Sequence, residues 1–147
     1  MTKVWRWPVR LLVILLVVGL VLLLITPQGR AATKALGFIS HILPSVPVKP
    51  LEWVTDKPVY IEVNYPLDSG TGVADLYLPA GSSRHSAVLF SQGVVPGGRF
   101  DPRIVALAEG LARTGMVVMV PWSDTQVHRR INPEDVGHLV NGVQYLI

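Results

Sequence analysis

The hydrophobic positions divide the chain into one unbroken apolar run near the N-terminus and shorter patterned segments in the second half. Every residue from Leu11 to Ile25 is apolar or glycine, and Trp5 and Trp7 precede this run. A helix that includes both tryptophans would be about 33 Å long, enough to cross a hydrocarbon core of roughly 30 Å. The pattern therefore predicts a transmembrane helix over residues 9–26, behind a basic flank over residues 1–8.

This segment fits an uncleaved signal anchor, although a secretory signal peptide has the same basic flank and apolar run. Residues 26–32 (TPQGRAA) lack an Ala-x-Ala cleavage motif, which favours the anchor. A cleaved signal peptide and a buried core helix are the alternatives. We expect a single-pass membrane protein, with the lipid bilayer as a partner, the N-terminus in the cytoplasm and the folded part exported.

Residues 27–50 predict a juxtamembrane and proline-rich linker. Within it, residues 31–43 have the pattern of a short amphipathic helix near the membrane interface, and His41 is interpreted as an interfacial polar residue. The sequence PSVPVKP that follows predicts a semi-rigid extended spacer.

Residues 51–147 have the alternation expected of a sheet with helices. Apolar and polar residues alternate from 59 to 65, which predicts a strand with one buried face. Residues 66–72 predict a turn, and residues 73–78 predict a second strand that closes an antiparallel hairpin.

Two continuous apolar runs, at residues 87–90 and 116–120, predict interior strands of a parallel sheet. Between them Asp101 is a suitable N-cap, Pro102 suits the first helical position, and Gly115 ends the helix. This order predicts one βαβ unit.

Asn132 and Pro133 predict the start of a last helix. Its apolar positions form one face: Val136, Leu139, Val140, Val143 and Ile147. Because this face runs to the last residue without a cap, we expect a partial α/β domain that is the first half of a longer one. A domain that simply ends in a helix is the alternative.

Charge is distributed unevenly. Residues 1–50 contain six basic and no acidic residues, whereas residues 51–147 contain seven basic and ten acidic residues. A nucleic-acid-binding protein concentrates basic residues on its folded part, so nucleic acid is excluded as the main partner. The chain has no cysteine, which excludes disulfides, thiolate metal sites and a cysteine nucleophile.

The loop from Ser91 to Arg99 (SQGVVPGGR) is a candidate functional loop, because it directly follows an apolar strand and ligands bind at the carboxyl ends of such strands. It lacks the glycine patterns of dinucleotide- and phosphate-binding loops, so a nucleotide-binding domain is disfavoured. A glycine-rich turn without function is the alternative. No spacing of histidines and carboxylates indicates a metal site, and no cofactor is expected.

The order of elements resembles the first half of an α/β-hydrolase of the dienelactone-hydrolase-like or prolyl-oligopeptidase-like group. The resemblance covers residues 57–147 and is carried by VADLYLPAGSSRHSAVLFSQGVVPGGRFDPRIVALAEGLARTGMVVMVPW and INPEDVGHLVNGVQYLI. It implies that backbone N–H groups at Gly93 and Val94 contribute to an oxyanion hole. Many members have histidine before this glycine, whereas this chain has Gln92.

The resemblance also implies that the catalytic serine, acid and histidine follow Ile147, because the nucleophile motif G-x-S-x-G does not occur in the chain. Six residues have suitable types but form no expected triad: His85, Ser91, Asp124, His128, Asp135 and His138. Ser91 lacks the nucleophile-elbow context, Asp135 and His138 are interpreted as first-turn capping and solvent-facing residues, and His128 as part of a solvated loop. The expected function is the N-terminal part of a membrane-anchored serine hydrolase of ester, amide or peptide bonds, inactive as this chain alone. The alternative is a non-catalytic, membrane-tethered α/β binding module or a decayed hydrolase fragment.

Overall fold

The computed structural model describes residues 6–81, 84–130 and 132–147. Two compact units divide between Gly37 and Phe38. The second unit therefore begins inside the segment that the sequence assigned to the linker.

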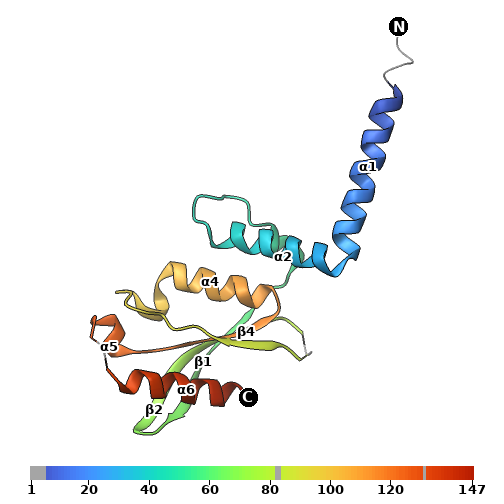
Figure 1. The fold of residues 1–147 in the computed structure, drawn as a ribbon. Helices are drawn as coiled ribbons and strands as arrows, with labels where there is room; N and C mark the ends of the chain where they lie inside the picture. Colours follow the sequence, from blue (N-terminus) through green and yellow to red (C-terminus); the bar gives the residue numbers. More distant parts are fainter. Residues whose placement is uncertain (1–5, 82–83, 131) are drawn as a thin grey trace. The chain divides into compact units, whose positions relative to one another are not determined.

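The first unit contains a long apolar helix, α1 (Arg6–Ile25) (Figure 1). Its stretch from Trp7 to Ile25 has a mean hydropathy of 3.0 and no buried residues, so it is long and apolar enough to cross a membrane. The helix begins before residue 9 because Pro8 lies in its first turn, where a missing N–H leaves no hydrogen bond unmade.

A bend at Thr26 separates α1 from α2 (Pro27–Ile42). The Thr26 hydroxyl accepts a hydrogen bond from the Gly29 N–H at 3.1 Å, which is the geometry of an N-cap. Pro27 occupies the first helical position, so α2 begins earlier than the expected residue 31. Gly29 packs so closely that a Cβ there would lie 2.2 Å from the Leu23 carbonyl oxygen. The bend therefore requires glycine at this position.

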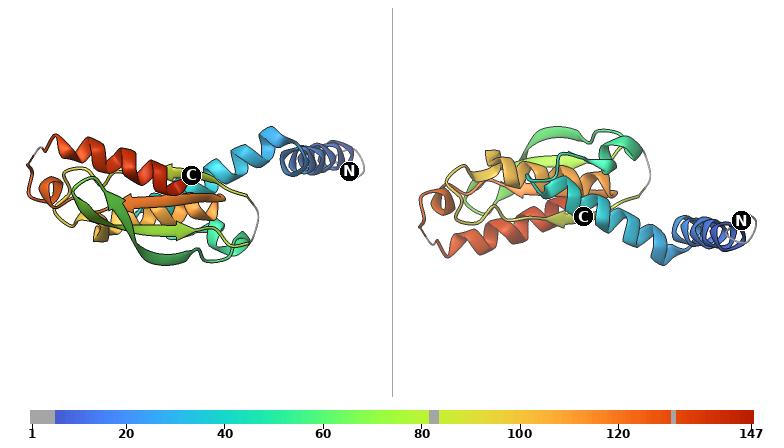
Figure 2. Two further views of the ribbon diagram at one scale, coloured as in Figure 1. Left: turned by 90° about the horizontal axis from the view of Figure 1, so that it is seen from below. Right: turned by 90° about the horizontal axis from the view of Figure 1, so that it is seen from above.

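The second unit is built on a four-stranded mixed sheet with the strand order β1-β2-β4-β3 (Figures 1 and 2). The strands are β1 (Val59–Leu67), β2 (Gly70–Leu78), β3 (Ser86–Leu89) and β4 (Met116–Pro121). β2 is antiparallel to β1 and β4, whereas β3 and β4 are parallel. This confirms a mixed α/β fold.

The hairpin of β1 and β2 is tighter than the sequence predicted. Residues 66–72 were expected to form a turn, but the strands continue until Leu67 and resume at Gly70. Pro66 is tolerated because β1 is an edge strand, and Gly70 adopts a positive φ of 147° beside the turn.

The prediction of two interior strands is confirmed for β4 but not for β3 within the described residues. β4 lies between β2 and β3, and its residues Val118, Met119 and Val120 are buried. β3 pairs on one side only, so within the described residues its other edge has no partner.

Helices cover both faces of the sheet (Figure 1). On one face, Ile104 and Ala108 of α4 (Pro102–Arg113) pack in a cluster with Tyr77 and Val118. On the other face, Leu146 of α6 (Glu134–Leu146) packs against a cluster of strand residues: Tyr65, Ala74, Leu76 and Met119. The two hydrophobic cores therefore share β2 and β4.

The start and end of α4 follow the sequence prediction. The Asp101 carboxylate accepts a hydrogen bond from the Arg103 N–H at 2.9 Å, and Pro102 is the first helical residue. Hydrogen bonds from the Arg103 side chain and backbone lower the pKa of Asp101 to about 2. Gly115, with a φ of 103°, follows the helix.

The last helix has the expected apolar face, but most of this face is exposed. Val136, Val140 and Val143 are exposed. Gly142 faces the sheet instead, where a Cβ would lie 2.6 Å from Leu89. Glycine permits a close approach of helix and sheet, and this approach determines which face of α6 is buried. The polar loop before α6 contains a short helix that the sequence did not predict, α5 (Asp124–Val127).

We predict that Met119→Ala lowers the free energy of unfolding by about 2–5 kcal/mol, because Met119 is completely buried and its truncation leaves a cavity. Urea denaturation of the full chain in detergent, followed by circular dichroism, measures the change. Val140→Ala, on the exposed face of α6, is the control and should change stability by less than about 0.5 kcal/mol. Equal effects of the two substitutions would contradict the assignment of the core.

Candidate functional site

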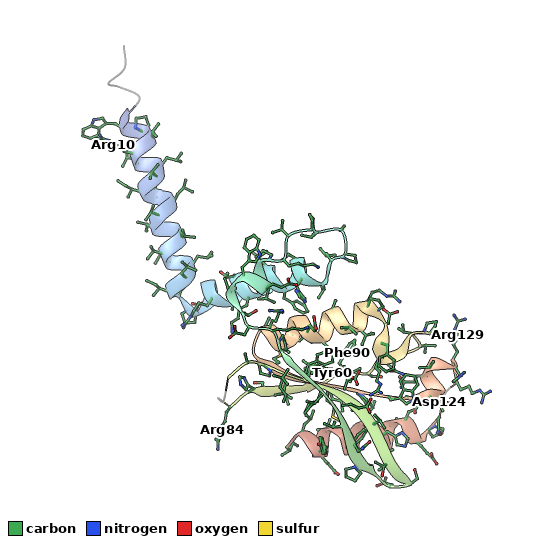
Figure 3. The ribbon with its side chains drawn as sticks, turned by 180° about the vertical axis from the view of Figure 1, so that it is seen from behind. Arg10, Tyr60, Arg84, Phe90, Asp124 and Arg129 are labelled. Atoms are coloured by element: carbon green, nitrogen blue, oxygen red, sulfur yellow. The ribbon has the colours of Figure 1, made fainter. Side chains whose placement is uncertain are left out.

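The loops that follow β3 and β4 meet at one end of the sheet. Because these strands are parallel and Leu89 pairs with Met119, their carboxyl ends lie at the same edge. Figure 3 places Asp124 and Arg129 at this end of the unit and Arg84 at the opposite end. Ligand sites in parallel α/β sheets form at the carboxyl ends of strands, so this edge is the candidate site.

Gln92 joins the two loops. Its side chain is almost completely buried, and its Nε2 donates a hydrogen bond to the Ser123 carbonyl oxygen at 3.0 Å. Ser91 makes a second connection, because its hydroxyl donates to Oε1 of Gln126 at 3.1 Å. The loop after β3 is therefore held to the loop after β4 and to α5 by side chains.

Gly93 and Val94, the two residues that the resemblance assigned to an oxyanion hole, lie where this loop reaches solvent. Gly93 has a φ of 62°, and a Cβ there would meet no atom within 4 Å. The Val94 side chain is 58% exposed. Within the described residues, neither N–H group donates a hydrogen bond to another protein group. Neither donor is therefore engaged within the described part of the chain.

Gly98 fixes the far end of the same loop. It has a φ of 54°, and its N–H donates to the Val95 carbonyl oxygen at 2.8 Å. A Cβ on Gly98 would lie 2.5 Å from the Trp122 ring. The indole therefore packs directly on the backbone of the turn.

Arg99, in the 3-10 helix η1 (Gly98–Phe100), connects the loop to the sheet. Its guanidinium is buried and forms ion pairs with Asp75 of β2 at 2.7 Å and with Glu62 of β1 at 2.5 Å. The rings of Phe100 and Trp122 flank it, with centroids 4.7 and 5.8 Å away. These contacts form an ion-pair cluster that sequence reasoning missed. The available signal in the sequence was Asp75, a charged residue between Ala74 and Leu76 in an apolar strand, which requires a buried partner.

The cluster shifts the pKa values of its members. Burial raises the pKa of Asp75, and the Arg99 charge partly opposes this shift. Burial and a hydrogen bond to Asp75, 3.0 Å long, raise the pKa of Tyr60. Burial, with the nearby Asp75 charge, raises the pKa of Tyr77 to about 12. Tyr60 and Tyr77 therefore stay protonated near neutral pH. The ion pairs of Arg99 with Asp75 and Glu62 hold the loop against the sheet.

The other candidate residues serve local structure. The Asp135 carboxylate accepts hydrogen bonds from Ser123 and Thr125, each at about 3 Å. His128 Nδ1 contacts the Asp124 carbonyl oxygen at 2.9 Å. The remaining two lie elsewhere: His85 contacts the Gly115 carbonyl oxygen before β4, and His138 lines a cavity beside the β1–β2 turn. None of these contacts forms a serine–histidine pair.

Within residues 6–81, 84–130 and 132–147, no group of three or more histidine or carboxylate side chains is placed to hold a metal ion. Comparison of the chain with family models, with curated proteins and with solved structures found no match.

We predict that Gly98→Ala destabilises the protein more than Gly93→Ala. Both glycines have a positive φ, which costs about 1–2 kcal/mol for alanine, but only at Gly98 does the added methyl group collide with Trp122. Urea denaturation of the two full-length variants measures the difference. Equal losses would show that the indole does not pack on this turn.

We also predict that Arg99→Met lowers the free energy of unfolding by about 3–5 kcal/mol near neutral pH, because it leaves Asp75 buried without its cation. Loss of the cation raises the pKa of Asp75 further, which favours its protonated form in the folded state. The decrease in the free energy of unfolding, relative to the parent chain, should therefore become smaller as the pH falls.

Urea denaturation of the Arg99→Met and parent chains near neutral pH and near pH ~5 measures this trend. Adding Asp75→Asn should recover part of the lost stability, because it removes the unpaired charge. Arg103→Met, at an exposed position, is the control. A loss that does not depend on pH would contradict the role of Asp75.

Proposed function

We propose that this chain is the N-terminal part of a membrane-anchored serine hydrolase with an α/β-hydrolase-like fold, acting on ester, amide or peptide bonds. The strand order β1-β2-β4-β3, with β3 at the edge, carries the proposal. In the resembled fold, the strand that bears the nucleophile pairs next with the strand equivalent to β3. The edge of β3 is the position that this strand would occupy.

The loop after β3 supports the same proposal. In α/β-hydrolases the loop after the third strand supplies one oxyanion-hole donor, and here the Gly93 and Val94 N–H groups are available at that position. Gln92 replaces the histidine of many members. Because the donor is a backbone group, the side chain needs only to fix the loop, and the hydrogen bond from Gln92 to Ser123 does so.

In the proposed mechanism, a serine outside these 147 residues attacks the substrate carbonyl while a histidine removes its proton. Negative charge then develops on the carbonyl oxygen. The Val94 N–H and a second N–H next to the nucleophile donate hydrogen bonds to this oxygen. This chain contributes the donor and the sheet that positions it.

The proposed location follows from α1. A helix of this length and hydropathy at the N-terminus fits a signal anchor, with the N-terminus in the cytoplasm and the second unit exported. A cleaved signal peptide would leave the same exported unit without its anchor.

We predict that a biotinylated fluorophosphonate, which labels active serine hydrolases, captures a polypeptide containing residues 57–147 from the membranes of cells that make this protein. An antibody against these residues detects it. The 147-residue chain, purified alone, should remain unlabelled and should not hydrolyse a small aryl ester. Heat-treated membranes are the control.

Two outcomes would contradict the proposal. Labelling of the purified chain would place the nucleophile within it. Failure to capture residues 57–147 from membranes where the antibody detects them would favour the non-catalytic binding module or decayed fragment. If the polypeptide is captured, Val94→Pro, which removes the N–H, should slow its labelling by about 10²-fold or more, whereas Val94→Ala should not.

A further inference from the structure

The second unit begins with a small folded segment, residues 38–56, that contains the end of α2, a loop and α3 (Pro50–Val54). The loop folds back over the end of α2, because Lys49 Nζ donates hydrogen bonds to the carbonyl oxygens of His41 and Leu43. A turn from Val46 N–H to the Leu43 carbonyl oxygen closes it further. We call residues 38–56 the juxtamembrane segment.

One face of the juxtamembrane segment packs on α4. A Cβ at Gly110 would lie 3.1 Å from both Phe38 and His41. At the end of the segment, Arg113 Nη1 donates to the Thr55 carbonyl oxygen at 2.9 Å, and Leu51 is buried. This face is therefore occupied by the folded unit itself.

His41 lies on this inner face, with its Nδ1 3.5 Å from the Glu52 carboxylate. Burial lowers its pKa, although Glu52 and Glu109 oppose the shift, whereas Lys49 and Arg113 reinforce it. The sequence-based interpretation of His41 as an interfacial residue is thus wrong, because its ring is buried against α4.

The segment also exposes five large apolar side chains, which we call its outer face: Ile39, Leu43, Val48, Trp53 and Val54. Trp53 is 75% exposed and Val54 is 78% exposed. Single exposed apolar residues are common, but five within one short segment indicate an interaction surface.

Two observations favour lipid as the partner. First, only Thr26 separates α2 from the candidate membrane span, and the segment starts within α2. Second, Trp53 is exposed, and tryptophan prefers the membrane–water interface.

We propose that the outer face of the juxtamembrane segment lies in the interfacial region of the bilayer. The apolar side chains enter the boundary between headgroups and acyl chains, as those of interfacial amphipathic helices do. The second unit is then attached to the membrane by this face as well as by α1. This proposal depends on α1 as a membrane span and is independent of the proposed hydrolase activity.

The absence of cysteine allows a direct test with single spin labels on the full chain. We choose three matched substitutions: Val54→Cys in the segment, Val17→Cys in α1 and Val136→Cys on the exposed face of α6. Each variant is reconstituted at low density in vesicles of phosphatidylcholine and phosphatidylglycerol. Power-saturation measurements compare collisions with oxygen, which partitions into lipid, and with a polar nickel chelate, which stays in water.

Oxygen should be the stronger relaxant at positions 17 and 54, and the nickel chelate at position 136. Lipid accessibility at 17 with water accessibility at 54 would overturn the proposal while keeping the anchor. Water accessibility at 17 would overturn the anchor as well. Spin–spin broadening at 54 in dilute vesicles would show that a second copy of the chain, and not lipid, covers this face.

Discussion

The structure of the second unit depends on the burial of β4 on all sides. Val118 and Val120 face α4, Met119 faces α6, and the strand pairs with β2 on one edge and β3 on the other. Among the described strands, β2 also pairs on both edges and contributes to both cores. The candidate site depends on this arrangement, because both of its loops follow strands that β4 aligns.

The Arg99 cluster fixes a loop that has little apolar area of its own against the sheet. An irregular segment of eight residues between β3 and η1 would ordinarily vary in position. Here the buried guanidinium connects η1 to β1 and β2. Trp122 packs on the turn at Gly98. The loop that contains Gly93 and Val94 is thereby fixed in position, as the proposed oxyanion hole requires.

The sequence predicted those elements whose signals are local. The cap at Asp101, the proline after it and the apolar runs of β3 and β4 gave correct positions for the βαβ unit. The errors of the sequence-based predictions concern properties that depend on which strands and helices pack against each other. β3 has an interior composition but an edge position, and α6 turns inward the face that contains Gly142 instead of its most apolar face. For the candidate site, the loop was recognisable, but the ion pairs of Arg99 join residues 24 and 37 positions apart and leave no periodic pattern.

The strand order has a consequence for synthesis at the ribosome. β1 and β2 are adjacent in sequence and can pair as soon as both have emerged. Among the described strands, β3 pairs with β4 alone, and 26 residues separate the two. Until β4 is available, β3 has no strand to join, and neither face of the sheet can be completed. Such non-local pairing slows folding and prolongs the exposure of apolar strands. The nascent chain would therefore benefit from a chaperone that holds residues 86–115 until the central strand arrives.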